Sequence, residues 1–220
     1  MITAVVAVRE GSQRCKQKNI RPFGDTNLLE MKLKNLKKVR NLDKIVVNSE
    51  SDRLLQVGID NGVETFKRDP YYATSEVNNS EIHGHIADVT ETDTIFLAPV
   101  CSPFISVETH EKAIDYFMNN DMDSLTSVTE VKNHLWQDDK PLNYDVRNVP
   151  NSQDLPDIKL LNYGIAIIDR KVMKEVRGVV GHNPGFWKTS DLESIDIDTE
   201  FDWMIAESLY LRMKEDGHKF

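Results

Sequence analysis

The stretch that most limits the fold is an apolar run near the start of the chain, Ala4 to Val8, which a short basic loop follows at once. An apolar run rich in valine and ended by a glycine-containing loop predicts a strand buried on both faces, as in a parallel sheet. The loop contains Gly11 and, within ten residues, four cationic side chains, which are Arg9, Arg14, Lys16 and Lys18. In an open α/β sheet, ligands bind at the loop after the first strand.

The chemistry of this loop indicates a site for a polyphosphate. Backbone N–H groups there can point at phosphate oxygens, and Gly11 permits close approach. Arginine adds two-pronged hydrogen bonds and lysine a point charge. The pattern is neither Gly-x-x-x-x-Gly-Lys-Ser/Thr nor Gly-x-Gly-x-x-Gly. A plain solvated basic loop is the alternative interpretation, and spacing alone does not separate the two.

A second charged centre lies near the end of the chain, at Asp196-Ile197-Asp198. In a strand-like context, alternation places both carboxylates on one side and the isoleucine on the other. Paired carboxylates beside a polyphosphate are suitable oxygen ligands for Mg²⁺. The alternative is that Asp198 only caps the helix that follows.

The order of expected elements predicts an α/β fold. Apolar runs at 44–48, 63–66, 94–98, 124–128 and 160–168 predict strands, and amphipathic patterns at 29–40, 54–59, 81–89, 107–117, 172–176 and 201–213 predict helices. This alternation implies a Rossmann-like, mostly parallel sheet with right-handed crossovers and helices on both faces. The polar, proline-containing segment 132–157 has no clear period, and a connection of that length is usually functional or covered by a partner.

Composition narrows the class of protein. A chain of 220 residues predicts a single domain with a sizeable core. The net charge of −9 argues against non-specific binding to nucleic acid. Cys15 and Cys101 have no metal-ligand spacing and are expected to be reduced thiols. The sequence has no long apolar segment and no basic leader, so we expect a cytoplasmic protein without a membrane span.

Both charged centres resemble signatures of one enzyme family. Arg9-x-Gly11-Ser12 followed by Lys18-Asn19 is similar to the loop motif of the CMP-sialic acid synthetases (acylneuraminate cytidylyltransferases). The stretch from Ser194 to Asp202, with Ala206-Glu207 after it, resembles the C-terminal signature of the same family. The resemblance implies a nucleotide-diphospho-sugar transferase type of fold, with Mg²⁺ on Asp196 and Asp198. It implies nucleotide binding by Arg9, Gly11, Ser12, Arg14, Lys18, Asn19, Arg68 and Ser80.

Weaker matches extend the resemblance over nearly the whole chain. Ser102-Pro103 and Gln153-Asp154-Leu155-Pro156 followed by Tyr163-Gly164 are similar to family segments near the sugar. They imply sugar binding by Ser102, Gln153 and Tyr163, and a small dimerisation or sugar-site extension at 132–157. Several positions depart from the family pattern, including Gln13, Ala98, Ser152 and Leu161. The departures lie mainly on the sugar side, so the acceptor stays open.

The resemblance implies a Mg²⁺-dependent reaction of CTP with a sialic-type sugar acid that gives the CMP-sugar and pyrophosphate, in a homodimer. Arg9, Lys18 and Asp198 would be the catalytic residues. The alternatives are a nucleotidyltransferase for another acceptor (3-deoxy-manno-octulosonate, a legionaminate-like acid or a sugar phosphate) or a non-catalytic nucleotide-binding module. No general base is assigned; His83 and His85 are candidates by residue type only.

Overall fold

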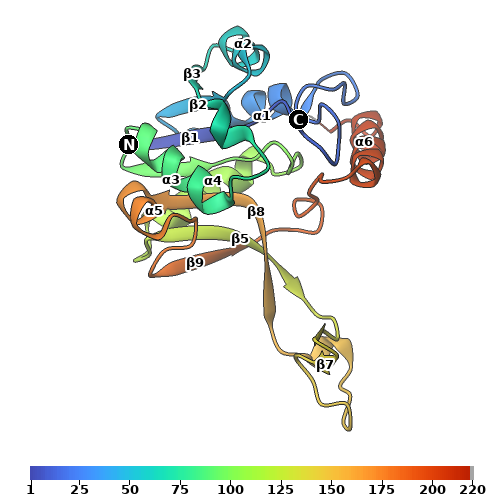
Figure 1. The fold of residues 1–220 in the computed structure, drawn as a ribbon. Coiled ribbons are helices and arrows are strands. Elements are labelled where there is room, and N and C mark those ends of the chain that lie inside the picture. Colours follow the sequence, from blue (N-terminus) through green and yellow to red (C-terminus); the bar gives the residue numbers. More distant parts are fainter. Residues whose placement is uncertain (219–220) are drawn as a thin grey trace.

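The body of the molecule is built on one seven-stranded sheet, with the strand order β3-β2-β1-β4-β8-β5-β9 (Figure 1). The computed structural model describes residues 1–218. The strands are β1 (Ile2–Ala7), β2 (Lys44–Ser49), β3 (Glu64–Lys67), β4 (Thr94–Leu97), β5 (Ser124–Val131), β8 (Ile158–Asp169) and β9 (Pro184–Lys188). Strands β1 to β4 are parallel, β8 is antiparallel to both of its neighbours, and β9 is parallel to β5. The prediction of a mostly parallel sheet is therefore confirmed.

Strand β1 lies in the middle of the sheet, as its apolar run predicts. Val5 pairs with Val46 on one side and with Leu97 on the other. Ala4 and Val6 pack into one hydrophobic cluster and Val5 into a second, so both faces of the strand are buried. This alternation explains why the whole run is apolar.

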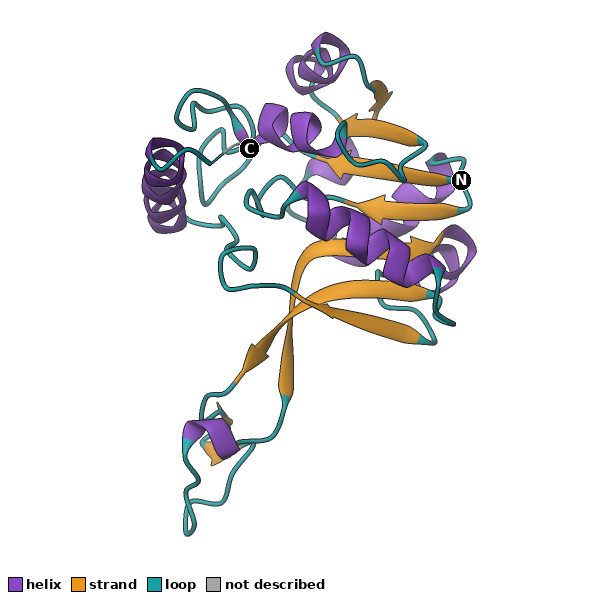
Figure 2. Cartoon of the chain, turned by 180° about the vertical axis from the view of Figure 1, so that it is seen from behind, coloured by secondary structure: helices purple, strands orange, loops and turns teal. Residues whose placement is uncertain are grey.

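Helices cover both faces of the sheet, which confirms the expected layers (Figure 2). The helices are α1 (Leu28–Leu36), α2 (Asp52–Asp60), α3 (Asn79–Val89), α4 (Val107–Met118), α5 (Arg170–Val176) and α6 (Glu200–Glu215). Buried side chains of α1, α2, α4 and α6 pack in the larger cluster. Those of α3 and α5 pack in the smaller cluster on the opposite face.

Some local predictions need correction. The first helix was expected to reach about Arg40, but it ends at Leu36. The segment around Asp196 and Asp198 was expected to be strand-like, and the structure assigns it no strand. Its backbone is instead held by a hydrogen bond from Ile197 N–H to the Cys101 carbonyl, at 2.9 Å. Strand β9 was not predicted, because its alternation is interrupted by proline and glycine.

The outer halves of β5 and β8 leave the body together and carry residues 132–157 as an arm (Figure 1). The arm contains two short strands, β6 (Trp136–Gln137) and β7 (Lys140–Pro141), and the 3₁₀ turn η2 (Ser152–Asp154). A second 3₁₀ turn, η1 (Pro70–Ala73), follows β3 in the body. Over the residues that the structure describes, no helix has the length and apolarity needed to cross a membrane.

Candidate functional site

The basic loop and Asp198, far apart in the sequence, meet in one hollow of about 210 Å³ at the carboxyl ends of β1 and β4. An Arg14 guanidinium nitrogen lies 3.0 Å from a carboxylate oxygen of Asp198. Lys18 Nζ lies 3.5 Å from the same oxygen and donates a hydrogen bond to the Ile197 carbonyl at 2.5 Å. Arg9 and Ser12 line the same hollow. The basic loop therefore faces the carboxylate directly.

The local sequence explains how Asp198 comes to face the loop. Thr199, not Asp198, is the cap of α6: its hydroxyl accepts from the Asp202 N–H, and the Asp202 carboxylate accepts from the Thr199 N–H. The same Asp202 oxygen also accepts from the Asp198 N–H at 3.1 Å. The capping alternative for Asp198 is wrong, and its carboxylate is left for the cleft.

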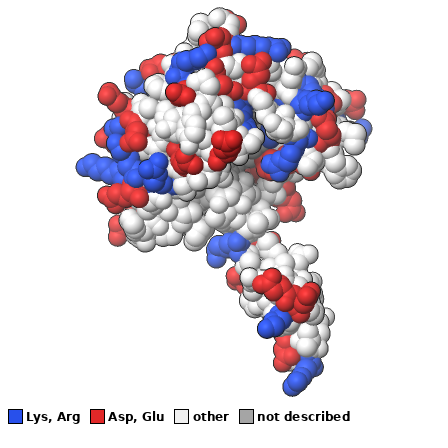
Figure 3. Space-filling model, in the orientation of Figure 1, with Lys and Arg blue, Asp and Glu red and all other residues white. Residues whose placement is uncertain are grey.

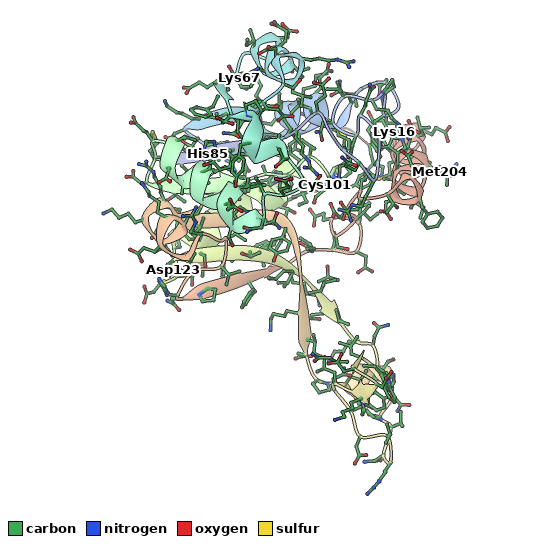
Figure 4. All side chains as sticks on the ribbon, viewed as in Figure 1. Lys16, Lys67, His85, Cys101, Asp123 and Met204 are labelled. Atoms are coloured by element: carbon green, nitrogen blue, oxygen red, sulfur yellow. The ribbon has the colours of Figure 1, made fainter. Side chains whose placement is uncertain are left out.

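Asn19 has a positioning role in the basic loop. Its side-chain amide is buried and donates to the Arg9 carbonyl at 2.7 Å, which ties the end of the loop to its start. Lys16 lies next to α6, where its backbone N–H donates to a Glu200 carboxylate oxygen (Figure 4). Gly11 is exposed, and a Cβ there would meet nothing within 4 Å. The loop is thus fixed at both ends and open at Gly11.

Beside the loop, a second hollow of about 360 Å³ contains Arg9, Arg68 and Tyr72. Arg9 donates to the Ala73 carbonyl at 2.9 Å. Arg68 is only 3% exposed, and one guanidinium nitrogen donates to the Val8 carbonyl at 2.8 Å and to Glu50 at 3.0 Å. Its Nε has no partner among the described residues. A buried unpaired donor is costly, and an oxygen atom of a ligand would satisfy it.

A third and larger hollow, of about 630 Å³, lies on the face of β1, β4 and β8 that α3 and α5 cover. Ser80 and His83 of α3, Tyr163 of β8 and Arg177 after α5 line it, and Asp198 lies on the wall that it shares with the first hollow. The three hollows share wall residues and form one continuous cleft. Burial lowers the pKa of His83, so its imidazole is neutral at pH 7.

Tyr163 reaches the cleft because of an irregularity in β8. The pairing of β5 with β8 changes register between Thr126 and Val128, and Tyr163 takes a left-handed conformation with φ of 53°. The next residue must be glycine, because a Cβ on Gly164 would lie 2.5 Å from Ile105. Strained backbone at a cleft wall is typical of functional sites.

Behind the cleft, a buried lysine supports the loop that follows β4. Lys32 of α1 is 2% exposed and donates to the Ser102 carbonyl at 2.9 Å. Burial lowers the pKa of Lys32 to about 8. A lysine is ordinarily expected on the solvent-exposed face of such a helix. Lys32 lies three residues after Leu29 and four before Leu36, on the apolar stripe, and that spacing is the signal that was missed.

Two expected sugar-binding residues lie away from the cleft. The Ser102 side chain is buried near Gly164, and Gln153 is exposed in η2 on the arm. Neither lines any of the three hollows. His85 also stays outside, stacked on Tyr72 with ring centroids 4.0 Å apart. Cys101, to which the sequence assigned no role in the site, lines both the first and the third hollow.

The carboxylates fit a metal that completes its shell with other oxygens. Asp198 lines the cleft, whereas Asp196 is exposed and lines none of the three hollows. Both carboxylates are near enough to the Cys101 thiol to add to the effect of burial, which raises its pKa to about 12. Within residues 1–218, no group of three or more His, Cys, Asp or Glu side chains is placed to hold a metal. Mg²⁺ commonly takes one or two carboxylates together with phosphate oxygens and water, which suits this pair.

Comparison with known proteins decides the family. The family model described as Cytidylyltransferase matches residues 3–142, more than half of the chain. The chain belongs to the cytidylyltransferase family. This cytidylyltransferase is accordingly a nucleotidyltransferase enzyme, as the resemblance of its two motifs implies.

Two curated relatives are similar over almost the whole cytidylyltransferase chain. One is the post-translational flagellin modification protein B of Campylobacter coli, 23% identical over 94% of each chain. Another is the N-acylneuraminate cytidylyltransferase of Oncorhynchus mykiss, 24% identical over 96% of this chain and 50% of the fish protein. The chain thus spans about half the length of the fish relative.

Solved structures confirm the fold. A CMP:2-keto-3-deoxy-manno-octonic acid synthetase in complex with CTP superposes with a TM-score of 0.71 at 13% identity, over 96% of this chain and 99% of the other. The 4-diphosphocytidyl-2C-methyl-D-erythritol synthase of Anaerococcus prevotii gives a TM-score of 0.70 at 14% identity, over 96% of each chain. At this level of identity the likeness shows the architecture alone.

Proposed function

We propose that this cytidylyltransferase transfers CMP from CTP to a hydroxyl of a sialic-type sugar acid and releases pyrophosphate. The observation that carries the proposal is the 3.0 Å approach of Arg14 to Asp198 in a hollow that the rest of the basic loop also lines. The similarity to an N-acylneuraminate cytidylyltransferase and to a flagellin modification protein supports a sugar acid of this type as the acceptor.

Each of the three hollows would bind one part of the two substrates. Arg9, Ser12, Arg14 and Lys18 would hold the triphosphate by hydrogen bonds and charge. The nucleoside would extend into the hollow that contains Arg68, whose unpaired Nε is available to an oxygen acceptor. The acceptor sugar would occupy the larger hollow, with its reacting end at Asp198.

The reaction requires in-line positioning more than covalent chemistry from the protein. The acceptor hydroxyl oxygen bonds to the α-phosphorus, the bond from that phosphorus to the bridging oxygen breaks, and pyrophosphate leaves with the electron pair. Lys18 and Arg14 neutralise the charge that develops on the departing phosphates. Mg²⁺ held by Asp196 and Asp198 would supply Lewis-acid polarisation of the α-phosphate. The hydroxyl proton must leave, and His83, neutral and in the acceptor hollow, is a candidate to receive it.

The test is a substrate panel read by pyrophosphate release. Purified protein and Mg²⁺ are combined with CTP, ATP, GTP or UTP and with a set of ulosonic acids and sugar 1-phosphates. We expect release with CTP and a nonulosonic acid, and a CMP-sugar detected by mass spectrometry. Release with an eight-carbon ulosonic acid or a sugar phosphate alone would reassign the acceptor. Binding of CTP without release on any acceptor would favour a non-catalytic module.

We also propose that the active form is a homodimer that uses the arm. The arm exposes large apolar side chains, namely Trp136, Leu142, Val146 and Val149, each more than half exposed. Figure 3 shows that the body beside the root of the arm has a broad area without charged side chains. Exposed apolar groups that gather in this way are typical of association surfaces.

A further inference from the structure

Arg177 lies flat against a glycine on the wall of the acceptor hollow. The residue caps α5 in a left-handed conformation, with φ of 48°. A Cβ built on Gly84 of α3 would lie 2.9–3.0 Å from three atoms of the guanidinium group. Only glycine at that position lets the guanidinium lie where it does, so α3 provides a platform for this one cation.

Within the chain the charge of Arg177 helps to lower the pKa of Asp88, but it contributes less to that shift than Lys174 does. Within residues 1–218, its guanidinium has no hydrogen bond and no ion pair that would hold it, and the residue is exposed. The neighbouring acid on α3, Asp88, already pairs with Lys174 at 2.9 Å. Among the side chains that line this hollow, Arg177 and Asp198 carry the permanent charges, because burial keeps His83 neutral. The guanidinium is therefore available to a ligand.

Arg177 and Asp198 reach the hollow from elements on different sides of the body. Asp198 directly precedes α6, whereas Arg177 follows α5, which packs on α3 on the side of the body away from α6 (Figure 1). Helix α3 starts near the carboxyl ends of the strands, where Asn79 borders the hollow of Arg68. Gly84 lies five residues further along α3, which is about 7 Å along the helix axis from Asn79. A sugar that reacts at Asp198 presents its remote end to Arg177.

The chemistry of a 2-keto sugar acid then identifies what Arg177 meets. In the ring form of such a sugar, the carboxylate and the reacting hydroxyl are on the same carbon, so the carboxylate stays near Asp198 and the basic loop. Substituents on the far carbons extend toward Arg177. A guanidinium attracts carbonyl oxygens and repels ammonium groups.

Resting on the proposed function, we propose that Arg177 is a specificity-determining residue that binds the carbonyl oxygen of an acylamido substituent at the end of the sugar remote from the reacting carbon. An acceptor with a free amine at that carbon is disfavoured because its ammonium group meets the guanidinium. Gly84 is a positioning residue for this contact.

The experiment compares two acceptors that differ only in this group, acylamido or free amine, in wild type, Arg177→Gln, Arg177→Glu and Gly84→Ala. Wild type is expected to favour the acylamido sugar. Arg177→Gln should reduce that preference about tenfold or more, through the KM for the sugar and not the KM for CTP. Arg177→Glu should shift the preference toward the amine, and Gly84→Ala should behave like Arg177→Gln although it keeps the charge.

Lys171→Gln is the matched control, since it removes an exposed positive charge from α5 outside the hollow. Equal loss for both sugars in Arg177→Gln, or the same loss of preference in Lys171→Gln, would overturn the role of Arg177 while the proposed function stands. If wild type converts neither sugar nor any other in the panel, the proposed function falls and this inference falls with it. Unchanged melting temperatures show that the variants are folded.

Discussion

Arg14 and Asp198 form an ion pair across the mouth of the cleft, with the guanidinium and carboxylate 3.0 Å apart. Both side chains are well exposed, at 69% and 41%. Such a pair contributes at most about 1 kcal/mol to stability, so each partner can exchange the other for a phosphate or a metal ion at little cost. The ion pair therefore holds the basic loop next to Asp198 while leaving both charged groups able to bind a ligand.

Replacing Asp198 by Asn should abolish most of the activity. The change keeps the shape and removes the charge proposed to hold Mg²⁺, so we expect turnover of CTP and sugar acid to fall about 100-fold or more. Pyrophosphate release at saturating CTP and varied Mg²⁺ measures this. Asp60→Asn on α2, far from the cleft, is the control. Turnover within a few-fold of wild type would remove the ligand role from Asp198.

Replacing Arg9 by Ala should weaken CTP binding. Arg9 lines both the loop hollow and the neighbouring hollow, and a charged hydrogen bond to phosphate contributes about 1.5–3 kcal/mol. We expect the Kd for CTP, measured by calorimetry, to rise about tenfold or more. Arg53→Ala, an exposed cation on α2, should leave it unchanged. An unaltered Kd in Arg9→Ala would refute the phosphate-binding role of the loop.

Thr199 couples stability to the site, because its capping partner Asp202 also holds the Asp198 N–H. Thr199→Ala should lower the free energy of unfolding by about 1 kcal/mol, read from urea denaturation. It should also reduce turnover, because Asp202 would then hold the Asp198 backbone less firmly in place. Thr199→Ser keeps the hydroxyl and should restore both. If the Ala variant loses stability but keeps full turnover, the cap does not position Asp198.

The buried Lys32 predicts a pH dependence of stability. Its pKa falls from 10.5 in the unfolded chain to about 8 in the fold, so between these values the unfolded state binds more protons and stability rises with pH. Below pH 8 the lysine is charged in both states and the cost of burial is constant. Relative to Lys32→Met, wild type should gain about 3 kcal/mol between pH 8 and 10.5. Lys34→Met, on the exposed face, should follow wild type; parallel curves for Lys32→Met and wild type would contradict the shift.

The arm predicts the oligomeric state. Trp136→Ser combined with Leu142→Ser removes two large exposed apolar groups from it. Sedimentation should show a dimer for wild type and a shift toward monomer for the variant, with an unchanged circular dichroism spectrum. Ile59→Ser, an equally exposed apolar change on α2, should leave the dimer intact. A wild-type monomer at high concentration would exclude the dimer.

The sequence predicts β1, β2 and β4 well, because each contains at least three consecutive apolar residues and precedes a helix with a clear cap. Ser51 and Ser106 cap α2 and α4, and Gly62 follows α2 with φ of 69°. The edge of the sheet that contains β9 is harder to predict from the sequence. Strand β9 depends on its pairing with β5 and not on its own pattern.

The candidate site likewise contains some residues that the sequence predicts and others that it does not. A charge cluster that also resembles a family motif, such as Arg9 to Lys18, can be recognised from the sequence. Arg177 and Lys32 cannot, because their importance comes from tertiary neighbours: Gly84 under one guanidinium, and the Ser102 carbonyl at one ammonium group. Local patterns contain no information on such contacts.

Strand β8 belongs to two parts of the molecule at once. Its inner half pairs with both β4 and β5 inside the body, its outer half pairs with β5 at the root of the arm, and Tyr163 lies at the break between the two halves. Side chains on a strand alternate between faces, so one residue inserted or removed beyond that break would turn the arm over while the body kept its register. The number of residues in the outer half of β8 thus determines which way the two faces of the arm point, independently of the register inside the body.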